Sequence, residues 1–509
     1  MTENELRQLK SGTDIRGVAV DGLADHPLTL TDEAVRRITA GFAVWLARGA
    51  EKAVGPLRVS VGHDSRITSE HIRAIVVETL EAAGMIVLDC GLSSTPAMFM
   101  TTVDLGCDGA VQITASHHPY YRNGLKFFTR KGGLDGTDID SLLDYAVQGE
   151  ALHPTVPGSV EAVSYMNDYC ERLRRMICEG VNATDFQRPL RGFHIVVDAG
   201  NGVGGFYAEK VLLPLGADIS GSVFLEPDGM FPNHVPNPEN AQAMASISRA
   251  VTENHADFGV IFDTDVDRAA CVDARGNEIN KNRFIALASR IATEGVRGAT
   301  IVTDSTTSDG LKKFIEHDLG GVHHRFKRGY RNVINEAIRL NLEGIDCPLA
   351  METSGHAALR ENYFLDDGAY LVTKLIVKLA QLGREGKSLD DLIATLEEPA
   401  ECEEIRLNIT AEDFRAAGNR LIAQITAGCE KDDRYHIAPD NHEGIRVSFG
   451  PEDGDGWFLV RLSVHDPVIP INIESNRSGG CRKIAQMLLN VIGPSEEIDF
   501  TPLKRFAEK

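Results

Sequence analysis

Short apolar runs alternate with amphipathic stretches along most of this chain. Runs such as RVSVGH (58–63), HIVVD (194–198) and TIVTD (300–304) have the length of buried strands and end in polar loops. Between such runs lie segments with apolar residues at helical spacing, for example HIRAIVVETLEAAG (71–84) and AYLVTKLIVKLAQLG (369–383). This alternation is typical of βαβ units, in which helices cover a sheet.

Two landmarks recur three times along the chain. One apolar strand ends near Asp64, Asp198 or Asp304, and a second strand then enters a denser polar loop, in GAVQITASHHP, DFGVIFDTDVDR and CPLAMETSGH. Such internal repetition predicts three related α/β domains, each presenting one polar loop.

The pattern changes after a stretch expected to be helical, SLDDLIATLEE (388–398). Four short strands and two amphipathic helices then predict a smaller domain. We therefore expect three similar α/β domains with mixed sheets and a C-terminal α+β domain. Their expected extents are 1–157, 158–295, 296–397 and 398–509.

Composition narrows the classes of function. Net charge is −22 over 509 residues, so the surface repels nucleic acid and anionic membranes, and a phosphate-bearing substrate needs local cationic groups. Nine cysteines lie scattered without a CxxC pair, as in a reduced intracellular protein. The N-terminus does not resemble a signal peptide, and no run of about 18 apolar residues occurs. These features predict a cytoplasmic protein.

The first polar loop, TASHHP, places Ser116 where a strand ends. A serine at this point is often only a turn former or helix cap. Here His117, His118 and Pro119 follow directly, and Lys126 lies ten residues further on. A fixed hydroxyl with nearby donors can accept and return a phosphoryl group.

The second loop, DTDVDR, alternates Asp263, Asp265 and Asp267 and ends with Arg268. Three such close carboxylates repel one another unless a cation or several N–H donors neutralise them. Magnesium (Mg²⁺) prefers these oxygen ligands. An EF-hand is excluded because Arg268 and Ala274 stand where it needs Gly and Glu. A solvated acidic turn stays a competing interpretation.

The third loop, METSGH, holds Glu352, Ser354 and His356. These residues could simply cap a helix. As the third member of a repeated set, the loop is interpreted as a polyhydroxyl-recognition element, since one carboxylate can accept hydrogen bonds from two sugar hydroxyls.

In a fourth loop, RLSVHDP, Arg461 is expected to end an apolar strand, and Ser463 and His465 follow it. A guanidinium, a hydroxyl and loop N–H groups suit a phosphate dianion, although an ordinary strand end fits about equally well.

A glycine-rich turn offers a competing interpretation. Gly200, Gly202 and Gly205 spell GxGxxG after a strand, as in a dinucleotide-binding turn. The turn lies in the second of three similar units, and the required acidic residue has only Glu226 as a loose match. We therefore disfavour that interpretation.

Together and in this order, the four loops resemble those of the α-D-phosphohexomutases, the phosphoglucomutase and phosphomannomutase superfamily. The resemblance runs from SGTDIRG almost to the C-terminus. It implies a four-domain molecule with its active site in a central cleft, acting on sugar phosphates, as a monomer or homodimer.

The resemblance also implies roles for individual residues. Ser116 would carry the phosphoryl group, and the three aspartates with Ser116 would hold Mg²⁺. Arg16 and Lys126 would serve acid–base or phosphate roles. His356 would contact the sugar and, with Lys126, is a candidate for moving the hydroxyl proton. The residues implied to contact substrate are Arg268, Lys327, Glu352, Ser354, Arg461, Ser463 and His465.

Two departures from the family pattern stand out. His118 replaces the usual Asn, while Val464 and His465 replace a small residue and a Thr in the phosphate loop. The expected function is a hexose-phosphate mutase for glucose or mannose phosphates, working through a phosphoserine and a hexose 1,6-bisphosphate. A hexose-1,6-bisphosphate synthase with the same serine is the alternative, and a non-catalytic homologue is disfavoured by the intact polar loops.

Overall fold

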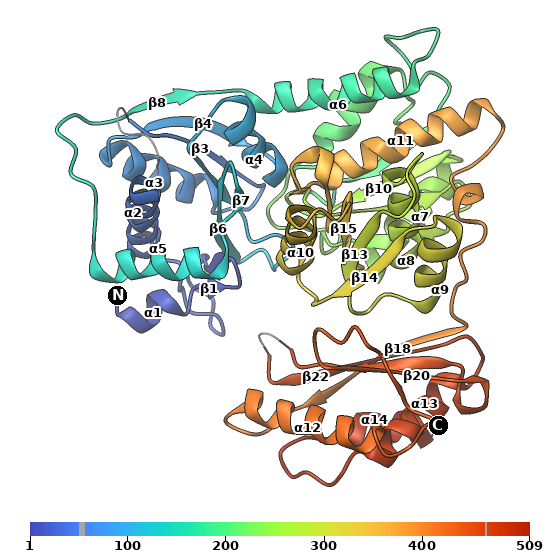
Figure 1. Cartoon of the computed structure of the whole chain (residues 1–509). Coiled ribbons are helices and arrows are strands. Elements are labelled where there is room, and N and C mark those ends of the chain that lie inside the picture. The colour runs from blue at the N-terminus through green and yellow to red at the C-terminus, as the bar shows by residue number, and fades with distance from the viewer. Residues whose placement is uncertain (50–55, 464–465, 509) are drawn as a thin grey trace. The chain divides into compact units, whose positions relative to one another are not determined.

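The computed structural model describes residues 1–49, 56–463 and 466–508 (Figure 1). It forms two compact units. Unit 1 comprises Met1–Asn280 with Ser354–Leu389, and unit 2 comprises Lys281–Thr353 with Asp390–Lys509. The predictions for Val464 and His465 lie outside the described residues.

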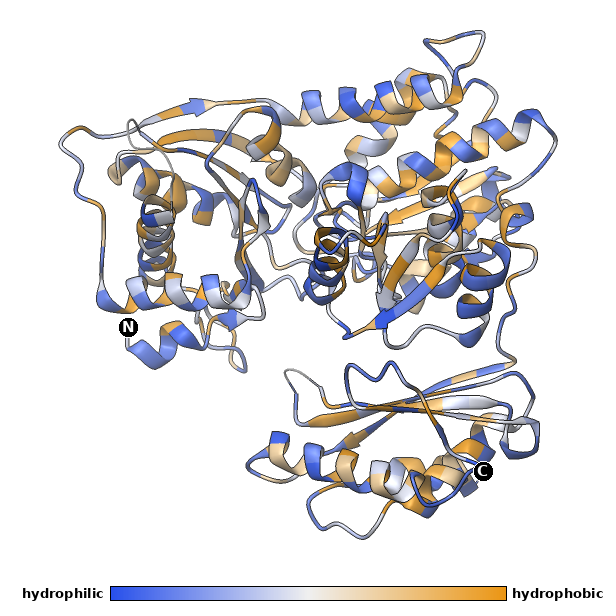
Figure 2. Cartoon of the chain, in the orientation of Figure 1, coloured by the Kyte–Doolittle hydropathy of each residue, from blue (hydrophilic) through white to orange (hydrophobic). Residues whose placement is uncertain are grey.

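Unit 1 begins with a mixed sheet covered by helices. Its elements are α1 (Glu3–Arg7), β1 (Lys10–Ser11), β2 (Asp14–Val18), α2 (Asp32–Gly49), β3 (Arg58–His63), α3 (Ser69–Ala82), β4 (Ile86–Leu92), α4 (Thr95–Asp104), β5 (Gly109–Ile113), β6 (Arg122–Thr129), β7 (Gly132–Gly133), α5 (Gly136–Gln148) and β8 (Ser159–Ala162). The strand order is β1-β2-β6-β5-β3-β4-β8, with β7 beside β6. Apolar side chains from α2, α3 and α5 pack on this sheet, and Figure 2 shows the hydrophobic residues concentrated on strands and on one side of the helices.

Unit 1 continues with a second sheet of order β12-β11-β10-β9. Its elements are α6 (Tyr165–Val181), β9 (Ile195–Asp198), a π-helical turn (Tyr207–Leu212), a 3-10 turn (Leu213–Leu215), α7 (Ala241–Asn254), β10 (Phe258–Phe262), β11 (Ala269–Asp273), β12 (Glu278–Ile279), the antiparallel pair β16 (Ala357–Leu359) and β17 (Leu365–Asp366) with a 3-10 turn between them (Arg360–Asn362), and α11 (Gly368–Arg384).

The glycine-rich turn after β9 serves packing. A Cβ added at Gly202 would lie 2.6 Å from the Thr264 carbonyl oxygen, and one at Gly205 would lie 2.2 Å from that of Leu225. The protein's own backbone therefore occupies the space in front of these glycines, which argues against a dinucleotide site at this turn.

Unit 2 contains a parallel arrangement and an antiparallel one. The first has α8 (Lys281–Ala292), β13 (Thr300–Asp304), α9 (Asp309–Lys313), a π-helical turn (Phe314–Asp318), β14 (Val322–Phe326), α10 (Tyr330–Leu342) and β15 (Leu349–Met351). β13 pairs in parallel with both β14 and β15.

The antiparallel sheet of unit 2 has the order β18-β22-β21-β20-β19. Its elements are β18 (Glu401–Asn408), α12 (Phe414–Cys429), β19 (His436–Ile437), β20 (Ile445–Phe449), a 3-10 turn (Pro451–Asp453), β21 (Gly456–Val460), β22 (Val468–Ser475), α13 (Gly480–Val491) and α14 (Thr501–Glu508). The three helices lie on one face of the sheet (Figure 1) and bury its apolar side.

The helix predicted over 388–398 is wrong. Only a 3-10 turn, Asp390–Ile393, forms there. Asp390 accepts a hydrogen bond from Arg283, and Thr395 donates one to Asp318, so neighbouring segments hold this stretch. Pro399 also disfavours helical geometry at the residue before it.

The threefold repetition appears in the strand pairing. β3 and β5, β9 and β10, and β13 and β15 are neighbouring parallel pairs, so the two landmark loops of each repeat leave the same sheet edge. Asp198 and Asp304 end the first strand of their pairs, and Asp64 directly follows β3. Each accepts a hydrogen bond from the backbone N–H two residues on, at 2.9 Å for Asp64, 2.9 Å for Asp198 and 2.8 Å for Asp304. The predicted fold class is confirmed. Among the described helices, none is both long and apolar enough to cross a bilayer.

Candidate active site

Ser116 lies just beyond β5 and is 4% exposed. Its backbone is in the left-handed region, with φ +51, which is uncommon for a residue other than Gly. The Ser116 hydroxyl donates to Asp263 Oδ2 at 3.0 Å, and Arg268 Nη2 donates to its oxygen at 3.4 Å. The serine thus touches both a carboxylate and a guanidinium of the DTDVDR loop.

The three aspartates of that loop gather at the end of β10. Asp263, Asp265 and Asp267 are all buried, and each offers one oxygen within 4.8 Å of the others. Val266, between the second and third, has φ +66, a conformation that β-branched residues rarely adopt. Strain of this kind is typical of functional loops.

Cationic and hydroxyl donors surround the triad. Lys126 Nζ lies 3.1 Å from Asp265 Oδ2 and 2.5 Å from Asp267 Oδ2. Arg268 Nε donates to Asp263 Oδ2 at 3.2 Å, and the Thr95 hydroxyl donates to Asp265. Thr95, at the start of α4, was not found by sequence reasoning because only folding brings it to the triad.

The electrostatics of the triad suit a bound cation. Burial raises the pKa of Asp263 well above its usual range, and the charges of Asp267 and Asp265 raise it further. Burial also opposes ionisation of Asp267, but Lys126, His356 and Arg268 outweigh it and hold the pKa of that carboxyl below its usual range. Within the described residues, Asp265 Oδ1 has no hydrogen-bond partner although it is buried. The carboxylate oxygens therefore fit a hard metal ion.

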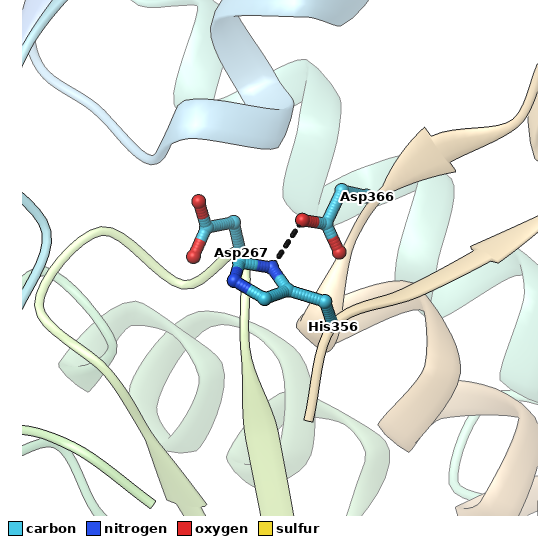
Figure 3. A group of neighbouring side chains, drawn as sticks. All are labelled: Asp267, His356 and Asp366. Atoms are coloured by element: carbon cyan, nitrogen blue, oxygen red, sulfur yellow. Dashed lines mark hydrogen bonds and ion pairs between the residues drawn. The ribbon is translucent and has the colours of Figure 1, made fainter. Parts of the chain in front are cut away.

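His356 lies between two carboxylates, as Figure 3 shows. Its Nδ1 is bonded to Asp366, and its other ring nitrogen faces Asp267. Burial lowers the pKa of His356, but the charge and hydrogen bond of Asp366 outweigh it and raise that pKa to about 9. Asp366 was missed from sequence, where the only sign is an acidic pair on the strand that returns after METSGH.

Arg16 and Lys126 lie on neighbouring strands. β2 pairs with β6 so that Arg16 is opposite Gly124, two residues before Lys126. Arg16 Nη2 donates to Asp14 Oδ2 at 2.7 Å. Burial lowers the pKa of His118 to about 3, and the charges of Arg16 and Arg122 act in the same direction, so this unusual histidine is neutral.

The METSGH loop is divided between the two units. Glu352 follows β15 in unit 2, is 3% exposed, and accepts a hydrogen bond from the Gly329 N–H at 2.5 Å. Lys327, two residues before Gly329, is exposed. Ser354 is buried and belongs to unit 1.

Arg461 follows β21 in unit 2 rather than ending it, and it is 9% exposed. Burial lowers the pKa of this guanidinium, and the nearby charge of Arg328 lowers it further, while Glu443 opposes that effect. Ser463 Oγ accepts a hydrogen bond from the Asp466 N–H at 3.3 Å. The Arg328 N–H donates to Glu443 at 2.8 Å. The charges of both residues act on Arg461, and neither residue was predicted from the sequence.

Comparison with protein families gives three matches in succession. Models of the phosphoglucomutase/phosphomannomutase α/β/α domains I, II and III match residues 7–151, 167–276 and 280–399. Together they span well over half of the chain.

Relatives and solved structures extend the similarity across the chain. A phosphoglucomutase of Neisseria gonorrhoeae is 28% identical over 96% of this chain and 97% of its own length. A phosphomannomutase/phosphoglucomutase of Pseudomonas syringae pv. tomato is 28% identical over 96% of each chain. The crystal structure of a phosphoglucomutase/phosphomannomutase family protein from Burkholderia thailandensis superposes with a TM-score of 0.78 at 25% identity, covering 96% of this chain and 97% of that one.

Proposed function

Since this chain belongs to the phosphoglucomutase/phosphomannomutase family, we propose that it interconverts hexose 1-phosphates and hexose 6-phosphates through a phosphorylated Ser116. The observation that carries the proposal is the position of the Ser116 hydroxyl, 3.0 Å from Asp263 in a buried cluster that also holds Lys126. A nucleophilic oxygen beside cationic groups suits phosphoryl exchange.

The chemistry takes two transfers. In the first, a sugar hydroxyl attacks the phosphorus of phospho-Ser116, the seryl oxygen leaves, and a hexose 1,6-bisphosphate forms. The sugar then turns over, and its other phosphoryl group returns to the Ser116 oxygen. Lys126 and His356 are the residues we assign to moving the hydroxyl proton, and Arg16 and Arg268 stabilise charge on the transferring oxygens.

Magnesium is the proposed cofactor. Asp263, Asp265 and Asp267, with an oxygen of phosphorylated Ser116, would hold it, and the bound ion would neutralise charge on the phosphoryl oxygens.

Substrate recognition is assigned to the other two loops. Glu352 and Ser354 would accept or donate hydrogen bonds to sugar hydroxyls, with Lys327 nearby in the chain. Arg461, Ser463 and His465 would hold the phosphate that is not reacting, because a guanidinium offers a planar fork to phosphate oxygens. Glucose and mannose phosphates are the proposed substrates.

Three expectations stay predictions: a monomeric or homodimeric state, a cytoplasmic location, and the domain extents 1–157, 158–295, 296–397 and 398–509. The alternative, a hexose-1,6-bisphosphate synthase with the same serine, needs looser phosphate anchoring at Val464 and His465, which lie outside the described residues. The similarity to mutases does not favour it.

Substitution of the serine tests the proposal. We expect Ser116→Ala to abolish conversion of glucose 1-phosphate and mannose 1-phosphate while the unfolding temperature stays close to that of the wild type. Ser93→Ala is the matched control, because Ser93 is a buried serine that follows strand β4 of the same sheet and donates to the Cys90 carbonyl oxygen. Full activity of Ser116→Ala would show that the phosphoryl carrier lies elsewhere.

A further inference from the structure

Arg66 is a fully buried cation that none of the four loops contains. It follows β3, and its side chain has no exposed surface. All five of its guanidinium N–H groups have acceptors. Nε donates to Asp64 Oδ2 at 3.2 Å. The other four N–H groups donate to backbone carbonyls of residues 116–122, here called the serine loop, namely Ser116, His118 (2.6 Å), Pro119 (2.8 Å) and Arg122 (2.9 Å).

Asp64 is also connected to the backbone N–H of Ser116, through the side chain of Thr114. The Ser116 N–H donates to Thr114 Oγ1 at 2.9 Å, and the Thr114 hydroxyl donates to Asp64 Oδ2 at 2.7 Å. The Ser116 N–H and C=O are therefore both fixed by groups that bond to Asp64. This explains how the loop holds a serine at φ +51, since surrounding contacts must stabilise such a backbone.

The face of the guanidinium is also covered. The Phe231 ring lies 5.1 Å from Arg66 Cζ, in a segment that precedes the metal-loop strand β10 in the chain. Close approach of that segment requires Gly229, where a Cβ would lie 2.4 Å from the Ile67 nitrogen. The carbonyls of the serine loop thus bond to the edge of the guanidinium, and the irregular segment that precedes α7 packs on its face.

We propose that Arg66, oriented by Asp64, is a positioning residue for phosphoryl transfer, which holds the Ser116 oxygen in line with the triad. This inference rests on the proposed function of Ser116. Misplacing a reacting group by about 1 Å costs on the order of 100-fold in rate, so the orientation of this loop bears directly on turnover. A lysine at this position offers three donors from one point and cannot span four carbonyls and a carboxylate.

The test compares Arg66→Lys and Thr114→Val with wild type and with Arg73→Lys. Arg73 is a suitable control because it lines the same cavity as Arg66 and pairs with Asp89. For each full-length protein, kcat and KM for glucose 1-phosphate are measured well below the unfolding temperature. Transfer of one phosphoryl group from glucose 1,6-bisphosphate to Ser116 is followed by rapid quench and mass spectrometry. In that step the seryl proton ends on the released sugar oxygen.

We expect Arg66→Lys and Thr114→Val to slow the transfer and kcat by roughly 10- to 100-fold with KM changed less than about twofold, and Arg73→Lys to behave as wild type. If Arg66→Lys does not fold, Thr114→Val alone decides the matter, because valine matches threonine in shape. Unchanged kcat with only a lower unfolding temperature would overturn the positioning role. Failure of wild-type Ser116 to take up the phosphoryl group would instead overturn the proposed function.

Discussion

Lys126 has two roles at the residue scale, and they predict opposite effects. Its ammonium contacts Asp265 and Asp267, so it competes with a cation for the same carboxylates. In the proposed mechanism the same group moves the hydroxyl proton. We expect Lys126→Met to lower kcat at least about 100-fold but to tighten Mn²⁺ or Mg²⁺ binding by about tenfold, because one positive charge near the ion is removed. Calorimetric metal titration measures the second effect.

Lys131→Met is the control for that experiment, because Lys131 is exposed beyond the end of β6, the strand that carries Lys126. It should change neither quantity. Weaker metal binding in Lys126→Met would mean that the ammonium orders the carboxylates more than it repels the ion.

The His356–Asp366 pair predicts a pH-dependent stability. The pKa of His356 in the folded state is about 9, above the usual 6.5. Protonated His356 beside Asp366 therefore stabilises the fold fully below pH 6.5, and this stabilisation is lost as the pH rises through 9. The free-energy gap between wild type and Asp366→Asn, measured by urea unfolding in EDTA, should therefore narrow from pH 6.5 to 10. The change should reach at most about 3 kcal/mol.

Asp140→Asn serves as the comparison, because Asp140 forms only an exposed pair with Lys10. Its gap to wild type should stay flat over this range. A gap for Asp366→Asn that does not depend on pH would contradict a protonated His356.

At the scale of elements, the first strand of each repeat ends in an aspartate that organises the loops. Asp304, at the end of β13, accepts four hydrogen bonds, from the backbone N–H and hydroxyl groups of Thr306 and Thr353 at 2.7 to 2.8 Å. Asp304→Asn replaces one acceptor oxygen with an NH₂ group that faces two donors. We expect this to destabilise the fold by about 2–4 kcal/mol. It should also raise KM for glucose 1-phosphate, because Thr353 follows Glu352.

Chemical denaturation and steady-state kinetics measure both effects, with the exposed Asp433→Asn as control. An unchanged KM in a destabilised Asp304→Asn protein would limit Asp304 to a structural role.

Elements with strong periodicity could be predicted from sequence, and the reasons are local. The helix from Gly368 to Arg384 has apolar residues at helical spacing, which indicates its type. The strand before Ser116 is a short buried run, and its length favours a strand. The stretch 388–398 has a helical composition, but side-chain bonds to Arg283 and Asp318 fix a different path. Composition cannot reveal such contacts.

The candidate site shows the same division. Ser116 and the DTDVDR aspartates could be found because they follow apolar strands in dense polar loops. Thr95 and Arg66 could not, since each acts through a partner remote in the chain. Asp366 bonds to His356, which is near in the chain, but it lies in no unusual pattern of its own.

At the scale of the whole molecule, the C-terminal α+β region predicts an autonomous domain. Its sheet and helices enclose their own core, including Leu407, Phe458 and Ile471, each without exposed surface. We expect residues 398–509 expressed alone to unfold in one cooperative urea transition. Trp457, which is 2% exposed and packs 3.6 Å from Arg446, should emit at longer wavelength than in the full chain.

That shift has a defined cause. Arg446 donates to the carbonyls of Ser305 and Thr307, which the fragment lacks, so the guanidinium that covers Trp457 loses these partners. Trp45, the other tryptophan, lies outside the fragment, so the tryptophan emission of the fragment comes from Trp457. A gradual, non-cooperative transition would contradict an independent domain.

The central claim, that Ser116 carries the phosphoryl group between two positions of a hexose, is tested most directly by following the group itself. Protein phosphorylated with glucose 1,6-bisphosphate is mixed with glucose 1-phosphate labelled with ³²P, and the label on Ser116 and in glucose 6-phosphate is measured over one turnover. The account predicts that label appears on Ser116 while each product molecule takes the phosphoryl group the serine carried before. Label that passes into glucose 6-phosphate without appearing on Ser116 would contradict it.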